Sequence, residues 1–192
     1  MSQSDLFQAA LEKLADNTAT AARKITNRRN ITKADKVIRL AALFNRANAT
    51  ATALGDVFTS RQLEELTGHP TPTKGIPATD DSARLLKSAT TALEDREAAL
   101  ERVERLARSE PLQSAQRAAT EAMSNHFGKR GGYIGWTRQL NTGACEVCQR
   151  WERDGRVWPP DHRMPQHPNC ACVQRIVITT TKPKSVRRKK HI

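Results

Sequence analysis

Five side chains near the C-terminal end of the sequence have the types and spacing of metal ligands. Cys145 and Cys148 form a Cys-x2-Cys pair, and His167, Cys170 and Cys172 follow after eighteen intervening residues. Thiolates and imidazoles are preferred ligands of Zn²⁺, which takes four of them in a tetrahedron when its role is structural. We therefore expect a structural zinc held by four of these five residues, with Cys145 and Cys148 among the four. The spacing leaves open which two of the other three complete the site.

The segment that carries these ligands differs in composition from the rest of the chain. Residues 128–181 contain all four cysteines, all three tryptophans and the only tyrosine. Tyr133–Leu140 and Val173–Thr180 have the composition of short strands. A core this small rarely stabilises a module without a staple, and a structural zinc contributes on the order of 10–16 kcal/mol to folding. Two disulfides, or four buried free thiols, are the alternatives to zinc. The tryptophans are expected to pack in and around the core.

The remainder of the chain is predicted to be helical. Five segments have apolar residues at helical spacing: 4–27, 32–54, 60–66, 81–108 and 111–127. Ser4 is a candidate cap for the first helix, and Thr32 with Asp35 approximates a capping box for the second. Gly55 is a plausible stop for the second helix, and Pro111 suits the first turn of the last one. The predicted class is therefore mainly α, with a helical hairpin and long amphipathic helices before a small zinc-stapled α+β module.

This pattern divides the sequence into five parts. They are a helical region at 1–66, a linker at 67–80, long helices at 81–127, a Cys/His module at 128–181 and a basic tail at 182–192. The linker is rich in proline, glycine and threonine. Within 81–108, Leu85, Ala92, Ala99 and Leu106 recur every seven residues. Such a stripe suits a helical partner in another protein, or an ordinary contact with its own chain.

The charge of the chain is unevenly distributed. Its formal net charge is +12, and six of these positive charges lie in the last eleven residues. They are Lys182, Lys184, Arg187, Arg188, Lys189 and Lys190. Like-charged blocks repel themselves, stay disordered and often contact nucleic acid, so we expect the tail to bind double-stranded DNA through its phosphates without base specificity. No apolar run approaches the length of a membrane span, and no signal peptide is visible.

Several short motifs around the cysteines resemble a known family. They are Gly135-Trp136-Thr137-Arg138, Cys145-x2-Cys148, Asp154-Gly155 and Pro165-x-His167-Pro168-Asn169-Cys170-x-Cys172. Together they resemble the C-terminal region of phage Mu F-like minor head proteins, also called head morphogenesis proteins, over about residues 135–178. Many relatives have a basic residue between the last two cysteines, where this sequence has Ala171. That departure leaves the metal pattern intact but removes one possible phosphate contact.

The resemblance implies a structural protein of a tailed bacteriophage rather than an enzyme. Such a protein is expected inside the virion head near the portal vertex, and in the host cytoplasm during assembly. The implied partners are the portal protein and packaged double-stranded DNA, with the major capsid or scaffold protein as further candidates. The implied role is to aid head assembly, genome packaging or DNA delivery.

An enzymatic alternative comes from the HNH family of treble-clef nucleases. A Cys-x2-Cys pair followed by Asp161-His162 and a second cysteine pair is similar to that arrangement, with the histidine as general base beside a metal ion. Against it, the segment after Cys172 is strand-like and leaves no helix for the remaining metal-binding residues. The second cysteine pair is also Cys-x-Cys rather than Cys-x2-Cys. The head-protein hypothesis is therefore preferred.

Overall fold

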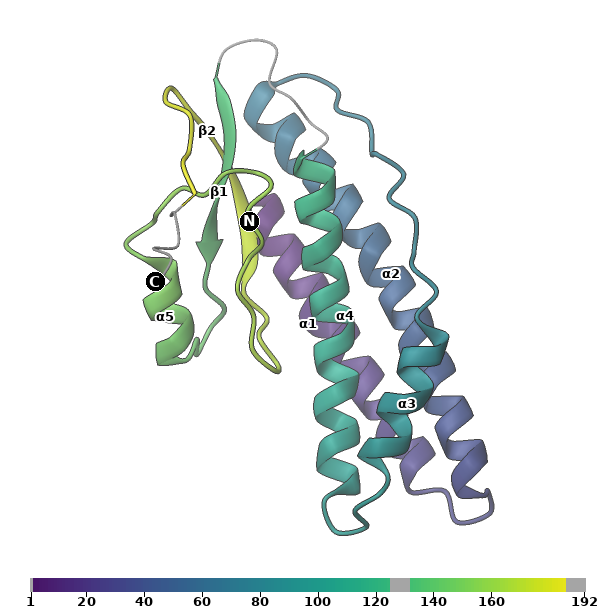
Figure 1. The fold of residues 1–192 in the computed structure, drawn as a ribbon. Helices are drawn as coiled ribbons and strands as arrows, with labels where there is room; N and C mark the ends of the chain where they lie inside the picture. The colour runs from purple at the N-terminus through teal and green to yellow at the C-terminus, as the bar shows by residue number, and fades with distance from the viewer. Residues whose placement is uncertain (1, 125–131, 186–192) are drawn as a thin grey trace, which may run out of the picture.

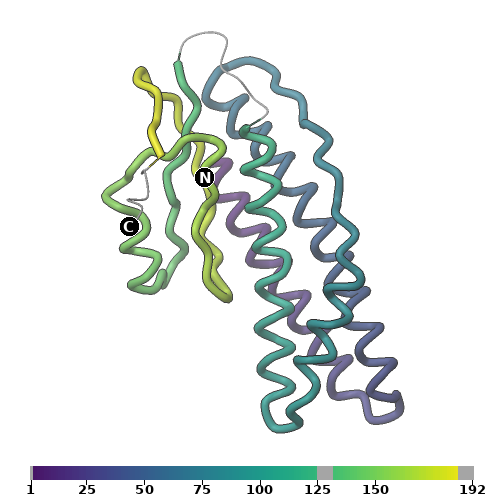
Figure 2. Tube along the Cα trace, in the orientation of Figure 1, coloured from purple at the N-terminus to yellow at the C-terminus, as the bar shows by residue number. Residues whose placement is uncertain are grey.

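The computed structural model describes residues 2–124 and 132–185, and it is mainly helical with one small sheet (Figure 1). The elements in chain order are α1 (Gln3–Thr26), α2 (Lys33–Thr67), α3 (Ser82–Ala92), α4 (Ala99–Ser124), β1 (Tyr133–Gln139), α5 (Glu146–Glu152) and β2 (Val173–Thr179). The long helices α1, α2 and α4 pack against one another as a bundle, and the short α3 lies against α2 and α4 (Figures 1 and 2). This order of elements confirms the predicted class, a mainly helical chain followed by a small module with two antiparallel strands.

Two capping boxes fix the starts of the first two helices. Thr32 and Asp35 satisfy each other's backbone N–H groups at the start of α2, as predicted. In α1 the same arrangement is made by Ser2 and Asp5, so the prediction of Ser4 as the cap is wrong. Ser4 lies inside α1 and is buried. The reciprocal hydrogen bonds require a carboxylate three residues after the cap, and Asp5 has that spacing only from Ser2.

The prediction that α2 ends at Gly55 is wrong. The helix continues without interruption to Thr67 and ends at Gly68, whose positive φ of 67° is typical of a C-terminal glycine. Gly55 is needed instead for a close approach to α4. A Cβ atom at this position would lie 2.5 Å from the Ala115 carbonyl oxygen and 3.0 Å from Ala118 Cβ. The glycine therefore sets the spacing of two helices.

The predicted single helix over 81–108 is instead two helices that run in opposite directions (Figure 1). Turns fill residues 93–98 between α3 and α4. Asp95 accepts hydrogen bonds from the backbone N–H groups of Glu97 and Ala98, at 3.1 and 3.3 Å, and so begins the next helix. The apolar residues that recur every seven positions continue across the turn, so they did not indicate the break. Leu85 before the turn and Ala99 after it are both buried in the same core.

The prediction that Pro111 opens a new helix is also wrong, since Pro111 is buried inside α4. The preceding residue is held by strong polar contacts. Glu110 accepts two hydrogen bonds from the Arg84 guanidinium, at 2.7 and 2.8 Å, and one from Asn48, at 2.9 Å. Burial opposes ionisation of Glu110, but these hydrogen bonds outweigh it and the pKa of Glu110 is lowered. This cluster joins α2, α3 and α4 at the proline.

The segment between α2 and α3 is attached to α2 rather than free. The buried carboxylate of Asp56 accepts hydrogen bonds from the backbone N–H groups of Lys74, Gly75 and Ile76, at 2.8, 2.7 and 3.1 Å. One turn further along α2, the Ser60 hydroxyl donates to the Thr71 carbonyl. The extended segment therefore runs back along the bundle between fixed points (Figure 2).

The sheet contains two strands that match the predicted segments. β1 and β2 are antiparallel, with Trp136 opposite Ile176 and Gln139 opposite Val173. On the other side of β1, Trp158 pairs with Trp136 through reciprocal backbone hydrogen bonds of 2.9 and 2.8 Å. On β2, the Ile176 N–H donates to the Gln62 side chain of α2, at 3.0 Å. Both edges of this small sheet are thus engaged by the rest of the chain.

The apolar core is shared between the bundle and the C-terminal module. One cluster combines Phe7, Leu11 and Leu112 of the bundle with Ala171 and Val173. A second cluster lies in the module but includes bundle residues. Its members are Leu63, Met123, Trp136, Cys148, Trp158, Met164, Cys170, Cys172 and Ile176. Within the described residues, no helix is both long and apolar enough to cross a membrane.

Replacing Gly55 with alanine tests the helix spacing. Alanine favours an α-helix over glycine by about 1 kcal/mol, yet the added Cβ meets backbone atoms of α4 that cannot move independently. We expect Gly55→Ala to lower the free energy of unfolding by about 1–3 kcal/mol, measured by urea denaturation. The exposed Ala53→Gly exchange is the matched control for helix propensity alone. A more stable Gly55→Ala protein would contradict the close approach.

Candidate metal centre

The structure brings the five predicted ligands into two groups that share one residue. In the first group, His167 Nε2 lies 3.3 Å from Cys145 Sγ and 3.0 Å from Cys148 Sγ. In the second group, Cys148 Sγ lies 3.4 Å from Cys170 Sγ, with Cys172 close by. Within each group all ligand atoms lie within 4.8 Å of one another, so each group could hold a metal ion. Cys148 belongs to both and is therefore the centre of the cluster.

Local backbone structure explains why segments so far apart in sequence converge. Cys145 is the N-cap residue of α5, so Cys148 follows in its first turn and both sulfurs reach the same side. His167 and Cys170 are joined by a tight turn, in which the Cys170 N–H donates to the His167 carbonyl at 3.2 Å. Asn169 takes a positive φ of 62° in this turn, a conformation that asparagine adopts more readily than most residues. Cys172 then leads directly into β2.

A buried guanidinium group lies beside the sulfurs. Arg138 on β1 is 3% exposed, and its Nη1 atom lies 3.8 Å from both Cys148 Sγ and Cys170 Sγ. Its Nη2 atom donates to the Pro165 carbonyl, and the group lies over the Trp151 ring at 5.3 Å. Among the residues that the structure describes, no carboxylate forms an ion pair with Arg138. Among the described residues, the sulfurs of Cys148 and Cys170 are therefore the groups next to Arg138 that would carry negative charge once deprotonated.

The surroundings shift the pKa values of the thiols in opposite directions. Backbone N–H groups at the start of α5, that of Cys148 first, lower the pKa of Cys145. Burial raises the pKa of Cys148 to about 11. The hydrogen bond between Cys170 and Cys172 raises the pKa of Cys170, which keeps its proton, and lowers that of Cys172 to about 5. The protein thus already stabilises thiolate at two of the four cysteines, Cys145 and Cys172.

The donor set and its spacing fit a tetrahedral ion. All four cysteines are free thiols, so the cluster is not a pair of disulfides in this structure. With metal–sulfur bonds of about 2.3 Å and metal–nitrogen bonds of about 2.0 Å, a tetrahedral ion separates its ligand atoms by roughly 3.5–3.8 Å. The observed separations of 3.0, 3.3 and 3.4 Å require only small movements to reach that range. Which four residues bind is left open by the two overlapping groups.

The helical bundle holds the segment that carries the last two cysteines. Gln116 of α4 donates its amide to the Cys172 carbonyl at 2.6 Å, and Gln8 of α1 donates to the Ala171 carbonyl at 3.1 Å. The Gln166 amide in turn donates to Gln116. Ala171 itself is buried against the bundle core. A long basic side chain at this position would not fit there, which accounts physically for the alanine.

The tryptophans support the module as core residues rather than as an open stacking surface. Trp136 is fully buried, and Trp158 is 6% exposed. His162 stacks on Trp158 with ring centres 4.2 Å apart, and its burial lowers its pKa. His162 and Asp161 belong to neither metal-ligand group among the described residues. The histidine therefore has a packing role in this structure.

The predicted DNA-contacting tail falls only partly within the described residues. Lys182 and Lys184 are exposed, and the Lys184 carbonyl accepts a hydrogen bond from Arg156 at 3.2 Å. Arg156 also lies 4.4 Å above the Trp158 ring. This contact fixes the point from which the tail leaves the module. Arg187, Arg188, Lys189 and Lys190 lie outside the described residues.

Two contributors to the site were not predicted from the sequence. Arg138 has the same parity as Trp136 along β1, so strand alternation would have placed both on the buried face. Strand alternation therefore predicts that Arg138 is buried, but it does not predict the contact of Arg138 with the cysteine sulfurs. Gln116 lies among alanines on the buried face of α4, but no local pattern marks its contact with Cys172, because that contact joins residues far apart in sequence.

Comparisons of the chain with family models, with curated proteins and with solved structures find no match. Function is therefore inferred from the site and the sequence motifs.

The contact between Gln116 and Cys172 predicts how strongly the module depends on the bundle. Gln116→Ala leaves the buried Cys172 carbonyl without its donor, which costs about 1–3 kcal/mol. We expect a corresponding loss in the free energy of unfolding and faster hydrogen exchange at residues 170–174. Gln113→Ala, one turn earlier and exposed, is the matched control. Equal effects of the two substitutions would show that Gln116 does not anchor the module.

Proposed function

We propose that the Cys/His cluster binds one structural Zn²⁺ through four of Cys145, Cys148, His167, Cys170 and Cys172. Several observations support zinc over other ions. The donors are sulfur and imidazole nitrogen, a set that favours zinc over hard cations such as Mg²⁺ or Ca²⁺. The candidate ligands come from the start of α5 and from residues 167–172, so one ion would cross-link two segments that lie far apart in the sequence. Arg138 would offset the negative charge that three or four thiolates bring to the ion.

The ligand set can be identified by single substitutions. We expect about one zinc per chain by elemental analysis of the purified protein, and a large fall in its melting temperature with a chelator. Cys148→Ser should abolish binding, because Cys148 lies in both ligand groups. Cys145→Ser should also lose the metal. Among His167→Asn, Cys170→Ser and Cys172→Ser, two should lose it and one should keep it.

His162→Asn is the control for substitution of a histidine in the same module, and it should retain the metal. A protein that is purified without metal, and whose melting temperature ignores both chelator and added Zn²⁺, would overturn the zinc proposal.

For the whole chain, we propose a minor head protein of a tailed bacteriophage, bound to the portal inside the head and touching packaged DNA without sequence preference. The resemblance of residues 135–178 to Mu F-like minor head proteins carries this proposal. Three of the four quoted motifs meet in one compact cluster, which supports it: Arg138, Cys145, Cys148, His167 and Cys170 all lie there.

Less apolar surface is available to a partner protein than the amphipathic pattern of residues 81–108 predicts. Leu85, Ala92 and Ala99 of the repeating row are buried against α1, α2 and α4, so the row packs within its own chain. Leu86, the residue after Leu85 in α3, is exposed. A portal contact would therefore use the outer polar faces of the bundle rather than its main apolar stripe. The basic residues that follow the module remain the proposed DNA contact.

The head-protein proposal predicts where the protein is found. Mass spectrometry of purified virions should detect it at far fewer copies than the major capsid protein, and the protein should bind purified portal rings. Affinity for duplex DNA should fall steeply with salt and vary little with sequence. Removal of residues 182–192 should weaken DNA binding and leave portal binding intact. Absence of the protein from both proheads and virions would overturn the proposal.

A nuclease assay separates this proposal from its enzymatic alternative. Incubation of the protein with plasmid DNA and Mg²⁺ or Mn²⁺ is expected to leave the plasmid intact. Cleavage that is lost in His162→Ala but kept in His69→Ala would favour the HNH-like nuclease instead.

A further inference from the structure

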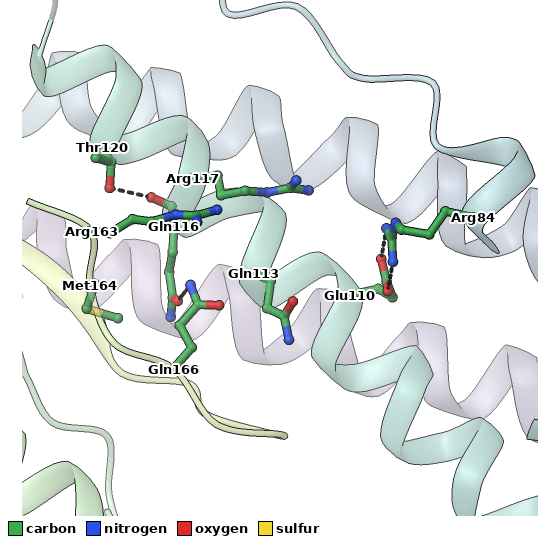
Figure 3. A pocket seen from close by; sticks show the side chains of 9 residues that line it. All are labelled: Arg84, Glu110, Gln113, Gln116, Arg117, Thr120, Arg163, Met164 and Gln166. Atoms are coloured by element: carbon green, nitrogen blue, oxygen red, sulfur yellow. Dashed lines mark hydrogen bonds and ion pairs between the residues drawn. The ribbon is translucent and has the colours of Figure 1, made fainter. Parts of the chain in front are cut away.

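A polar cleft lies where α4 meets the segment that leads to His167. It encloses about 440 Å³ and is lined by arginine and glutamine side chains from α3, α4 and residues 163–166 (Figure 3). None of the proposed metal ligands lines it. The cleft is therefore separate from the Cys/His cluster, although both use the same loop.

One of its three arginines is already neutralised. Arg84 forms ion pairs with Glu110 at 2.7 Å and with Asp81 at 2.9 Å. The fork of its guanidinium group faces the Glu110 carboxylate through two hydrogen bonds (Figure 3). Arg84 therefore forms a fixed wall at one end of the cleft and has no positive charge left for a ligand.

The other two arginines are not neutralised in this way. Arg117 lies 3.9 Å from Asp81, but that carboxylate is closer to Arg84. The nearer contact of Arg117 is a hydrogen bond to the Ser114 hydroxyl at 3.1 Å. Arg163 is exposed and forms no ion pair with any residue in the described part of the chain. The three arginines and the two carboxylates that pair with them therefore leave one net positive charge at the cleft, on the side of Arg117 and Arg163.

Neutral donors add to this arrangement. The exposed Gln113 side chain reaches the cleft without a hydrogen-bond partner among the described residues, so its amide is free to donate. The amides of Gln116 and Gln166 are bonded to each other, which fixes the floor of the cleft. A cation would be repelled by the arginines, and an apolar ligand would leave polar groups unpaired. An anion with several acceptor oxygens would be attracted by the arginines and would accept hydrogen bonds from the polar groups of the cleft.

We propose that this cleft binds a phosphate group, held between the guanidinium forks of Arg117 and Arg163 with the Gln113 amide as a further donor. Planar guanidinium groups match phosphate oxygens two at a time, which makes arginine the usual residue for such a site. The phosphate could belong to a free phosphate ester or to a nucleic-acid backbone, because both present the same oxygens. The inference does not depend on the head-protein proposal.

The test measures binding of pyrophosphate to the full-length protein by titration calorimetry at constant ionic strength. We expect saturable binding at one site per chain. The variant Arg117→Gln/Arg163→Gln should weaken it at least about tenfold, as expected when charge-assisted hydrogen bonds are lost. The control Arg28→Gln/Arg29→Gln removes the same charge from the exposed turn between α1 and α2, and it should change affinity less than about twofold.

A charge-preserving variant shows whether geometry matters. Arg117→Lys/Arg163→Lys keeps both positive charges but loses the forks, and it should bind more weakly than the original protein. A second arm measures binding of a short DNA duplex by fluorescence anisotropy. If pyrophosphate displaces the duplex, and the Arg117→Gln/Arg163→Gln variant binds the duplex more weakly, the ligand is a nucleic-acid phosphate. If neither pyrophosphate nor this variant changes duplex binding, the ligand is a free phosphate ester. The proposal is overturned if pyrophosphate does not saturate, or if the control variant weakens binding equally.

Discussion

The burial of the Arg138 guanidinium among cysteine sulfurs is the constraint on which the C-terminal module depends. A buried charge without a partner costs several kcal/mol, and the described part of the chain offers Arg138 no carboxylate. The cost is met if the neighbouring sulfurs carry negative charge, and a bound divalent ion would in turn make several thiolates compatible with one small volume. A bound ion and the Arg138 charge would therefore favour each other, because the ion would deprotonate sulfurs that lie 3.8 Å from the guanidinium group. The two-stranded sheet serves this arrangement, since β1 supplies the arginine and β2 follows directly from Cys172.

A second consequence is that the module and the bundle share their stability. The small number of large apolar residues in 128–181 indicates a marginal core, and the structure adds Leu63 and Met123 of the bundle to it. Polar contacts act in the same place, because Gln116 and Gln8 bind the backbone of the Cys-x-Cys segment. Loss of a metal ion from the cluster would therefore loosen the segment that docks on α1 and α4. Conversely, the bundle holds two of the candidate ligands near their final positions before any ion binds.

The helical class and both strands could be predicted from the sequence because they depend on local spacing, and the convergence of the five candidate ligands could be predicted from the chemistry of their donor atoms. Cys145 and Cys148 had to face one side of a turn, and the β-branched run at 173–180 had few alternatives to a strand. The errors at Gly55 and Pro111 have a common physical origin. Each is a residue type that usually ends a helix, and in each case residues distant in sequence decided the outcome. The error at residues 93–98 differs, because the periodic row continues across a turn that is formed by the local hydrogen bonds of Asp95. Gly55 is explained only by Ala115, and Pro111 lies beside a cluster formed by Glu110, Arg84 and Asn48. The roles of Arg138 and Gln116 also depend on residues that are distant in sequence.

The use of apolar surface within the chain also constrains how this protein could meet partners. The bundle packs through small residues, such as Ala51, Ala115 and Ala119, which let the helices approach closely. The apolar residues that recur every seven positions in α3 and α4 are buried in the same bundle. The exposed large apolar residues lie on several elements, from α1 and α2 to the two strands. After β2, the Lys184 carbonyl is joined to the module by the hydrogen bond from Arg156. Within the described residues, a partner would therefore meet separate apolar side chains and polar helix faces rather than one continuous apolar stripe.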